Sequence, residues 1–214
     1  KPEWLYYTNR NPINSLAVYE EYIWAGTNDG LVKINQTSGR TEFFHCANSG
    51  LPDNNIRSLT IDSRGQVWMI TGNSLASFDG SNWRVYTESN SGLPIDILST
   101  VSDDSLGNIW IGTHAKGLVH FDGRNWTLFI KENSGLHFNN ICSIVTDNSG
   151  SIWVGSCKGR IARFDGNIWK VYNSPYNITT TAIVSSDTVW FGTEEHGLVC
   201  FDFEERTWWK EYRS

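Results

Sequence analysis

The chain has 214 residues, of which 39% are hydrophobic and 19% are charged, and its formal net charge is -6. This composition is typical of a globular protein, and without a basic cluster it argues against nucleic acid and anionic membrane surfaces as partners. No apolar run approaches the roughly 20 residues of a membrane-spanning helix, so we expect no membrane insertion.

The chain begins with a short aromatic run that is similar to the last run of each later repeat. In residues 1–8, Trp4 stands shortly before Tyr7. A longer pattern containing a central tryptophan then recurs about every 37–44 residues, which is the period range of a four-stranded propeller blade. We place five repeats approximately at residues 9–47, 48–89, 90–132, 133–174 and 175–214. The central tryptophans are Trp24, Trp68, Trp110, Trp153 and Trp190.

Each repeat divides into four short runs of strand-like composition. In the second repeat these runs cover residues 56–61, 66–71, 74–79 and 82–87, and turn signals such as DSRG and DGSN separate them. No run has a sustained apolar period of about 3.6 residues, so helices should be nearly absent. We therefore predict an all-β fold, a single domain over residues 1–214 that forms a five-bladed β-propeller of four-stranded antiparallel blades.

The ends of the chain offer two ways to arrange the outer strands. Residues 3–8 could complete the last blade, which would leave residues 208–212 as an extra edge strand, or they could be the remnant of a preceding blade in a longer protein. We favour circular closure involving the N-terminal strand, because an open arc would expose two large apolar faces.

A second set of tryptophans recurs in the predicted outer strands. A single blade cannot bury both of its faces, so successive blades must stack. We therefore interpret both sets of tryptophans as packing between blades and not as a ligand cage. The outer set consists of Trp83, Trp126, Trp169 and Trp209.

These motifs resemble a known repeat. The pattern W-x-G-T-x-x-G-L-x-x-F-D-G-x-x-W-x-x-Y, followed by N-S-G-L-P-x-N-x-I, resembles the two-component regulator propeller repeat, with NSGLP at residues 48–52 and 90–94. The resemblance implies a propeller from a bacterial periplasmic sensor or secreted protein, hence a periplasmic or extracellular location. Family sensors usually have larger, paired propellers with a transmembrane helix and a kinase. These 214 residues contain none of that, so signalling is not carried over.

The turns between the first and second strands resemble a second motif. The pattern D-x-x-G-x-[IV]-W at Asp62, Asp104 and Asp147 is similar to the Asp-box of sialidases, although its spacing differs by a residue. No arrangement in the chain resembles the arginine cluster of those enzymes.

The loops of a propeller divide between two faces, and here only one face varies in sequence. The turns from first to second strand and from third to fourth strand have similar sequences in each repeat, so we predict that they are structural. Loops from second to third strand, and from each outer strand to the next blade, are polar and rich in amides, which suits sugar hydroxyls or peptide backbone. The alternative is that these are solvated turn residues. The candidate ligand-binding residues are Asn28, Asp29, Asn54, Asn55, Arg57, Asn73, Asp96, His114, Lys116, Asn139, Asn140, Lys158, Glu194, Glu195 and His196.

Arg57 belongs to a predicted ring of residues near the mouth of the propeller channel. Its guanidinium could hold a ligand carboxylate through paired hydrogen bonds, or it could pair with a neighbouring loop acid. The predicted ring consists of Asn14, Arg57, Ser99, Cys142 and Thr181.

Catalysis has little support in the sequence. His114 and His196 lie on the same predicted face as Glu194 and Glu195, a set that could bind a divalent metal only if the fold brought different blades together. No nucleophile elbow, Ser-His-Asp signature or phosphate-binding glycine loop is present. We therefore expect no enzyme, no metal and no cofactor, with a propeller lyase or hydrolase as the enzymatic alternative.

The four cysteines predict at most one bridge. Pairing across the turn at Asp147 places Cys142 opposite position 156 or 157, so Cys142 and Cys157 should be neighbours, either as a disulfide or as two free thiols. Cys46 and Cys200 should be unpaired.

The sequence thus favours a non-enzymatic recognition module, of sensor type, that binds a carbohydrate or another small polar ligand on the variable face. The alternative is a scaffold that binds another protein, or one part of a larger sensor protein.

Overall fold

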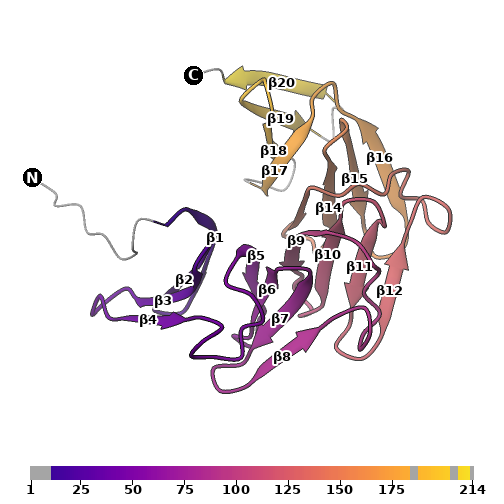
Figure 1. Ribbon diagram of the computed structural model, residues 1–214. Helices are drawn as coiled ribbons and strands as arrows, with labels where there is room; N and C mark the ends of the chain where they lie inside the picture. Colours follow the sequence, from indigo (N-terminus) through magenta and orange to yellow (C-terminus); the bar gives the residue numbers. More distant parts are fainter. Residues whose placement is uncertain (1–10, 184–187, 203–206, 213–214) are drawn as a thin grey trace, which may run out of the picture. The chain divides into compact units, whose positions relative to one another are not determined.

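The computed structural model describes residues 11–183, 188–202 and 207–212. Across these residues the chain forms twenty β-strands and no helix, as predicted, so no helix among them could cross a membrane. The strands form five sheets of four antiparallel strands, and each sheet keeps its strands in chain order (Figure 1).

The strand boundaries follow the predicted repeats. The first sheet contains β1 (Ile13–Tyr19), β2 (Tyr22–Thr27), β3 (Gly30–Asn35) and β4 (Thr41–Phe44). The second contains β5 (Ile56–Ile61), β6 (Val67–Thr71), β7 (Ser74–Phe78) and β8 (Trp83–Tyr86). The third contains β9 (Leu98–Asp103), β10 (Ile109–Thr113), β11 (Leu118–Phe121) and β12 (Trp126–Phe129). The fourth contains β13 (Ser143–Thr146), β14 (Ile152–Ser156), β15 (Arg160–Phe164) and β16 (Trp169–Asn173). The fifth contains β17 (Ile178–Ile183), β18 (Thr188–Thr193), β19 (Leu198–Asp202) and β20 (Thr207–Tyr212).

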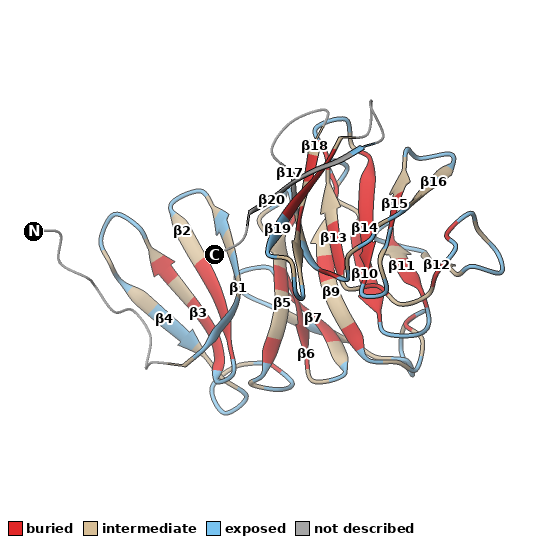
Figure 2. Cartoon of the chain, turned by 90° about the horizontal axis from the view of Figure 1, so that it is seen from above, coloured by how far each residue is buried: buried red, intermediate tan, exposed pale blue. Residues whose placement is uncertain are grey.

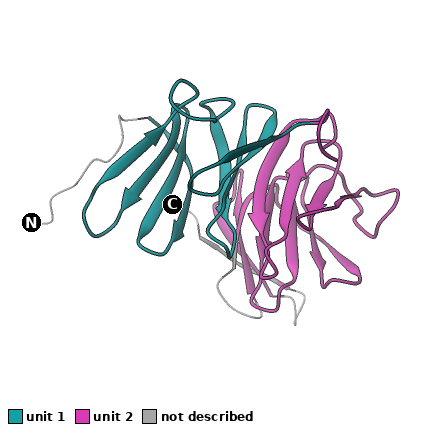
Figure 3. Ribbon diagram, turned by 90° about the horizontal axis from the view of Figure 1, so that it is seen from below, with its two compact units in different colours: residues 1–87 teal, residues 88–214 magenta. Residues whose placement is uncertain are grey.

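The chain divides into two compact units, residues 1–87 and 88–214 (Figure 3). The first unit holds the first two sheets and the second unit holds the other three. The division lies close to the predicted border between the second and third repeats. The predicted outer strand at residues 1–8 lies outside the described residues, so the predicted closure of the ring through it stays a prediction.

A buried carboxylate holds the turn between the first and second strands in three sheets. Asp104 Oδ1 accepts the amide N–H groups of Leu106 and Asn108, both at 2.9 Å, and its Oδ2 accepts the indole N–H of Trp110 at 3.0 Å. Asp62 and Asp147 make equivalent bonds to their own tryptophans. The D-x-x-G-x-[IV]-W pattern is therefore a local hydrogen-bonded unit that links the turn to the central tryptophan.

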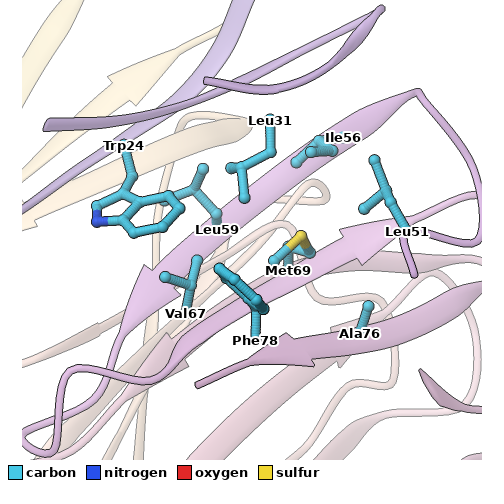
Figure 4. Close-up of a cluster of buried hydrophobic side chains, with 9 residues drawn as sticks. All are labelled: Trp24, Leu31, Leu51, Ile56, Leu59, Val67, Met69, Ala76 and Phe78. Atoms are coloured by element: carbon cyan, nitrogen blue, oxygen red, sulfur yellow. The ribbon is translucent and has the colours of Figure 1, made fainter. Parts of the chain in front are cut away.

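In the first unit, the central tryptophan packs between the two sheets, as predicted. Trp24 lies in one hydrophobic cluster with Leu59, Val67 and Phe78 of the second sheet (Figure 4). Its ring meets that of Phe78 edge to face, with centroids 6.2 Å apart. Burial of such large apolar rings is the main source of stability when sheets stack.

The second unit repeats this arrangement twice. Trp110 of the third sheet clusters with Ile144 and Val154 of the fourth, and Trp153 of the fourth sheet clusters with Val189 and Phe191 of the fifth. The middle strands of the sheets are the most buried, and β10 and β14 are buried along their whole length (Figure 2). The prediction that the central tryptophans separate successive sheets is thus confirmed within each unit for Trp24, Trp110 and Trp153.

The outer tryptophans Trp83, Trp126 and Trp169 are half-buried, as is the central Trp190. Loops that contain the NSGL segments cover these outer tryptophans. A Cβ on Gly50 would lie 2.6 Å from Cβ of Trp83, which is closer than a real Cβ approaches another atom. Glycine at this place therefore lets the loop pack directly on the outer tryptophan of the following sheet. The side chain of Trp209 lies outside the described residues.

The first strand of four sheets has a β-bulge at the same place. The bulged residues are Asn14, Arg57, Ser99 and Thr179. The prediction of Thr181 for this place in the fifth repeat was wrong, because Thr181 pairs regularly with Phe191 and the bulge lies at Thr179. Bulges change the direction of a side chain, and here they turn two of them toward the next sheet. Asn14 Nδ2 donates to Ile56 O at 2.9 Å, and Ser99 Oγ donates to Ile141 O at 2.6 Å.

Candidate functional site

Three loops of the variable face border an open hollow in the second unit. It has a volume of about 470 Å³ and lies where the β10–β11 turn, the β12–β13 loop and the β14–β15 turn meet. The antiparallel order of the strands places all three loops on the same face. The lining residues are His114, Ala115, Lys131, His137, Phe138, Asn139, Asn140, Ser156, Lys158 and Arg160.

The β10–β11 turn is held by hydrogen bonds to its backbone, which leaves its side chains to face outward. Thr113 Oγ1 donates to Gly117 O at 2.8 Å and accepts the amide N–H of Lys116 at 2.9 Å. Asp96 Oδ2 accepts the amide N–H groups of Ala115 at 2.6 Å and Lys116 at 2.8 Å. Partial burial raises the pKa of Asp96, but these amide bonds outweigh it and hold the pKa below its ordinary value. The anchor therefore stays ionised at neutral pH.

The β12–β13 loop is held by its own asparagines. Asn139 Oδ1 accepts the amide N–H of Lys131 at 2.8 Å, and Asn133 Oδ1 accepts that of Ile130 at 2.9 Å. Asn140 Nδ2 donates to His114 O at 2.8 Å, which joins this loop to the β10–β11 turn. The hollow is thus formed by loops that are fixed to one another.

A disulfide joins the third loop of the hollow, the β14–β15 turn, to the β12–β13 loop. Cys142 and Cys157 are bonded, with their Cα atoms 5.6 Å apart. The bridge links the end of the β12–β13 loop to the β14–β15 turn, immediately beside Ser156 and Lys158. Of the two outcomes left open by the sequence, the structure has the disulfide. Cys46 and Cys200 are free, as predicted.

The hollow brings together four of the fifteen candidate binding residues: His114, Asn139, Asn140 and Lys158. Lys116 belongs to the β10–β11 turn, and Asp96 holds that turn from the β8–β9 loop; neither residue lines the hollow. Asn139 and Asn140 also have structural roles, since the side chain of each forms a hydrogen bond that holds a loop in place.

In the first unit, several candidates serve the scaffold. Arg57 Nη2 donates to Gly72 O at 2.6 Å, so part of its guanidinium secures the β6–β7 turn. Asn54 Oδ1 accepts the amide N–H of Cys46 at 2.8 Å, as Asn139 does for Lys131 in the second unit. Asn28, Asp29, Asn55 and Asn73 are exposed.

In the fifth sheet, the candidates stay at the tip of the β18–β19 turn. Asn177 Nδ2 donates to Glu194 Oε2 at 3.2 Å, and the His196 ring lies 4.9 Å from that of Tyr176. Glu195 is exposed. Among the described residues, no group of three or more His, Cys, Asp or Glu side chains could hold a metal ion.

Lys131, Phe138, Ser156 and Arg160 line the hollow but were not predicted as binding residues. Arg160 begins β15 directly after the β14–β15 turn, and no sequence pattern singled it out. Its Nη1 donates to His137 O at 3.0 Å, a contact between loops that only the fold creates.

Comparison with known proteins supports the repeat type. A family model described as two component regulator propeller matches residues 50–73 and 135–158. Both segments run from an NSGL glycine through the first two strands to the β6–β7 or β14–β15 turn. They are two-component regulator propeller repeats.

Solved structures of other proteins share the fold. An extracellular domain assigned to the hybrid two-component system BT3049 of B. thetaiotaomicron matches at 22% identity and a TM-score of 0.73, over 89% of this chain and 28% of that one. The corresponding domain of BT4673 from the same organism matches at 18% identity and a TM-score of 0.74, over 100% and 30%. The chain therefore spans less than a third of the length of these two structures.

One similar structure is an enzyme. Virginiamycin B lyase from Staphylococcus aureus matches at 14% identity and a TM-score of 0.61, over 96% of this chain and 85% of that one. At such identity the likeness concerns the fold alone. No curated protein sequence compared with the chain matches it.

We expect the disulfide to stabilise the propeller repeats beside the hollow. Changing Cys142 to serine should lower the free energy of unfolding by about 2–4 kcal/mol, because the bridge restricts the unfolded chain. Urea unfolding followed by tryptophan fluorescence measures this. The matched control is Cys46→Ser, which alters an exposed free cysteine. Equal losses in the two variants would contradict a stabilising bridge.

Proposed function

We propose that this chain is a non-enzymatic recognition module that binds a small polar ligand, most simply a carbohydrate, in the hollow of the variable face. The observation that carries the proposal is the meeting of three fixed loops around about 470 Å³ lined by imidazole, amide, hydroxyl and cationic groups. Polar groups fixed around a concave site suit a ligand with several hydroxyls, since each fixed group costs little ordering on binding.

The relatives support a sensor setting for this module. The two B. thetaiotaomicron structures are extracellular domains of two-component systems. We propose by analogy that the chain works in the periplasm or outside the cell as the ligand-binding part of a sensor. The Cys142–Cys157 disulfide supports this location, because such bridges persist in oxidising compartments. We also propose that the five sheets are the blades of one propeller closed through residues 1–8.

A blocking variant tests the site directly. Ala115 is an exposed residue of the lining, and tryptophan at this position would fill the hollow while the backbone bonds to Asp96 remain. If a saccharide panel yields a binder by calorimetry, Ala115→Trp should weaken its affinity at least tenfold. Asn167→Trp, in an exposed turn after β15, is the matched control and should bind normally. Full binding by Ala115→Trp would place the ligand elsewhere.

A protein partner is the second candidate, and exposed apolar side chains favour it. Ile95 is 74% exposed and Ile97 is 48% exposed, in the β8–β9 loop beside the β10–β11 turn. Isolated exposed apolar residues are common, but two beside a hollow suit a partner that covers the rim. For this candidate, Ile95→Ser with Ile97→Ser should abolish partner binding and leave saccharide binding unchanged.

A further inference from the structure

The charge of the hollow differs from the charge of the chain. Three of its ten lining residues are obligate cations, Lys131, Lys158 and Arg160, and none is a carboxylate. Lys and Arg together make up only 17 of the 214 residues, and the net charge is -6. Basic residues are therefore enriched in the lining of the hollow, although the chain as a whole is acidic.

Only one carboxylate side chain contacts these cations across the described residues. Glu132 Oε1 lies 3.5 Å from Lys131 Nζ, and both side chains are 56% exposed. A pair in water contributes about 0–1 kcal/mol, so it neutralises the hollow only weakly. Lys158 lies in the β14–β15 turn and Arg160 begins the following strand, so both line the hollow from the same wall, and the lining contains no carboxylate.

Arg160 and Lys158 keep N–H donors that a ligand in the hollow could use. Arg160 Nη1 donates to His137 O at 3.0 Å, a bond that holds this side chain against the β12–β13 loop. A guanidinium has five N–H donors, so this bond leaves others for a planar oxyanion, which guanidinium groups bind bidentately. The disulfide fixes the turn between Ser156 and Lys158, which limits the ordering cost of placing the Lys158 charge.

We propose that the hollow binds an oxyanion, and specifically a carboxylate or sulfate group carried by an acidic saccharide. Lys158 and Arg160 bind the anionic group, with Lys131 adding charge from the opposite loop. Asn140 and the two histidines face the hydroxyls of the sugar. Asn139 supports the site from behind, because its Oδ1 already accepts the Lys131 N–H and its Nδ2 donates to Glu132 Oε2. This inference rests on the proposed function, because it names the class of ligand for the same site. The net acidic chain and the small size of the hollow argue against a nucleic acid as the source of the anion.

Calorimetry with matched ligands tests the proposal. The probes are a neutral disaccharide, the same disaccharide with one carboxylate or one sulfate, and inorganic phosphate and sulfate alone. We expect the acidic forms to bind at least tenfold more tightly than the neutral form. Their affinity should fall as salt rises, because an ionic contact is screened.

Charge variants locate the binding group. Lys158→Gln and Arg160→Gln should each weaken acidic-saccharide binding about tenfold or more, and by a clearly larger factor than they weaken any neutral-saccharide binding. Lys158→Arg keeps the charge and should retain binding. Arg124→Gln removes an exposed cation from a turn on the other face of the same unit and is the control. Thermal melting of each variant shows whether it is folded.

The outcomes separate this inference from the proposed function. Equal affinity for neutral and acidic saccharides would overturn the inference and leave saccharide recognition standing. Inorganic phosphate that binds as tightly as the acidic saccharide, with the same variant sensitivity, would support the anion site and overturn the carbohydrate assignment. Acidic-saccharide binding that survives both glutamine substitutions would overturn the proposed site. An absence of binding by every probe would overturn both proposals.

Discussion

Replacing Trp110 with alanine should lower the free energy of unfolding by about 3–5 kcal/mol, the usual cost of deleting a large buried side chain. Trp110 is 3% exposed and packs among Ile144, Val154 and Phe164 of the following sheet. Its removal leaves a cavity between two sheets that strands cannot easily close. Guanidinium unfolding measures the loss.

Two control variants separate the causes of this loss. Trp110→Phe keeps most of the ring but removes the indole N–H that Asp104 accepts, so its effect should be smaller. Ile168→Ala truncates a side chain that is 55% exposed and should change stability little. A Trp110→Ala variant as stable as Ile168→Ala would contradict the position of this ring between sheets.

Replacing Asp147 with alanine should destabilise the chain by about 3–5 kcal/mol, because removing one partner of a buried polar cluster leaves the others unsatisfied. Asp147 Oδ1 accepts the amide N–H groups of Ser149 and Ser151, both at 2.9 Å. Its Oδ2 accepts the Trp153 indole N–H at 3.0 Å and lies 3.4 Å from Arg163 Nη2. The same unfolding measurement reports the loss.

The pH dependence of this effect has a definite sign. Burial raises the pKa of Asp147, but hydrogen bonds from Ser149, Trp153 and Ser151 outweigh it and lower the pKa below its ordinary value. A carboxylate of this kind stabilises the fold above its unfolded pKa, and the stabilisation is lost as pH falls through the folded pKa. The stability difference between wild type and Asp147→Ala should therefore be full at neutral pH and shrink below about pH 4. A difference that grows on acidification would contradict it.

The matched control for Asp147 is Asp122→Ala. Asp122 also accepts two turn amides, from Arg124 and Asn125, and these bonds and the Asn125 side chain lower its pKa to about 2. It lies in an exposed turn, where water can replace the lost acceptor. Asp122→Ala should thus cost clearly less than Asp147→Ala. Equal costs would show that burial does not distinguish the two turns.

The local features of the repeat were predictable because they depend on residues close in sequence. The turn at Asp104, the tryptophan that follows it and the four runs of each repeat are all encoded within one sheet. Counting across one hairpin also placed Cys142 opposite position 156 or 157, and the pairing of Ser143 with Gly155 agrees with the first of these. The Thr181 error was one of alignment and not of physics. Thr179 stands 11 residues before Trp190, just as Arg57 stands 11 residues before Trp68, so the repeat itself contained the correct position.

The binding candidates were less predictable, because asparagine serves both turns and ligands. Asn54 and Asn139 fit a binding role by type, yet each uses its Oδ1 to hold a loop amide. Arg57 fits by type as an anion-binding residue, but its guanidinium donates to Gly72 O and so secures the β6–β7 turn. Arg160, by contrast, had no sequence signal as a site residue and lines the hollow. The difference lies in which loops meet, and those loops are tens of residues apart.

The sequence by itself determined that this chain is an all-β array of repeated four-stranded sheets, since turn chemistry and tryptophan spacing act over short distances. Only the tertiary structure decided which side chains share a hollow. That outcome depends on the stacking of the third and fourth sheets, on hydrogen bonds such as Asn140 to His114, and on the Cys142–Cys157 bridge. Contacts between loops of different repeats are set by packing geometry, which a single sequence pattern does not contain.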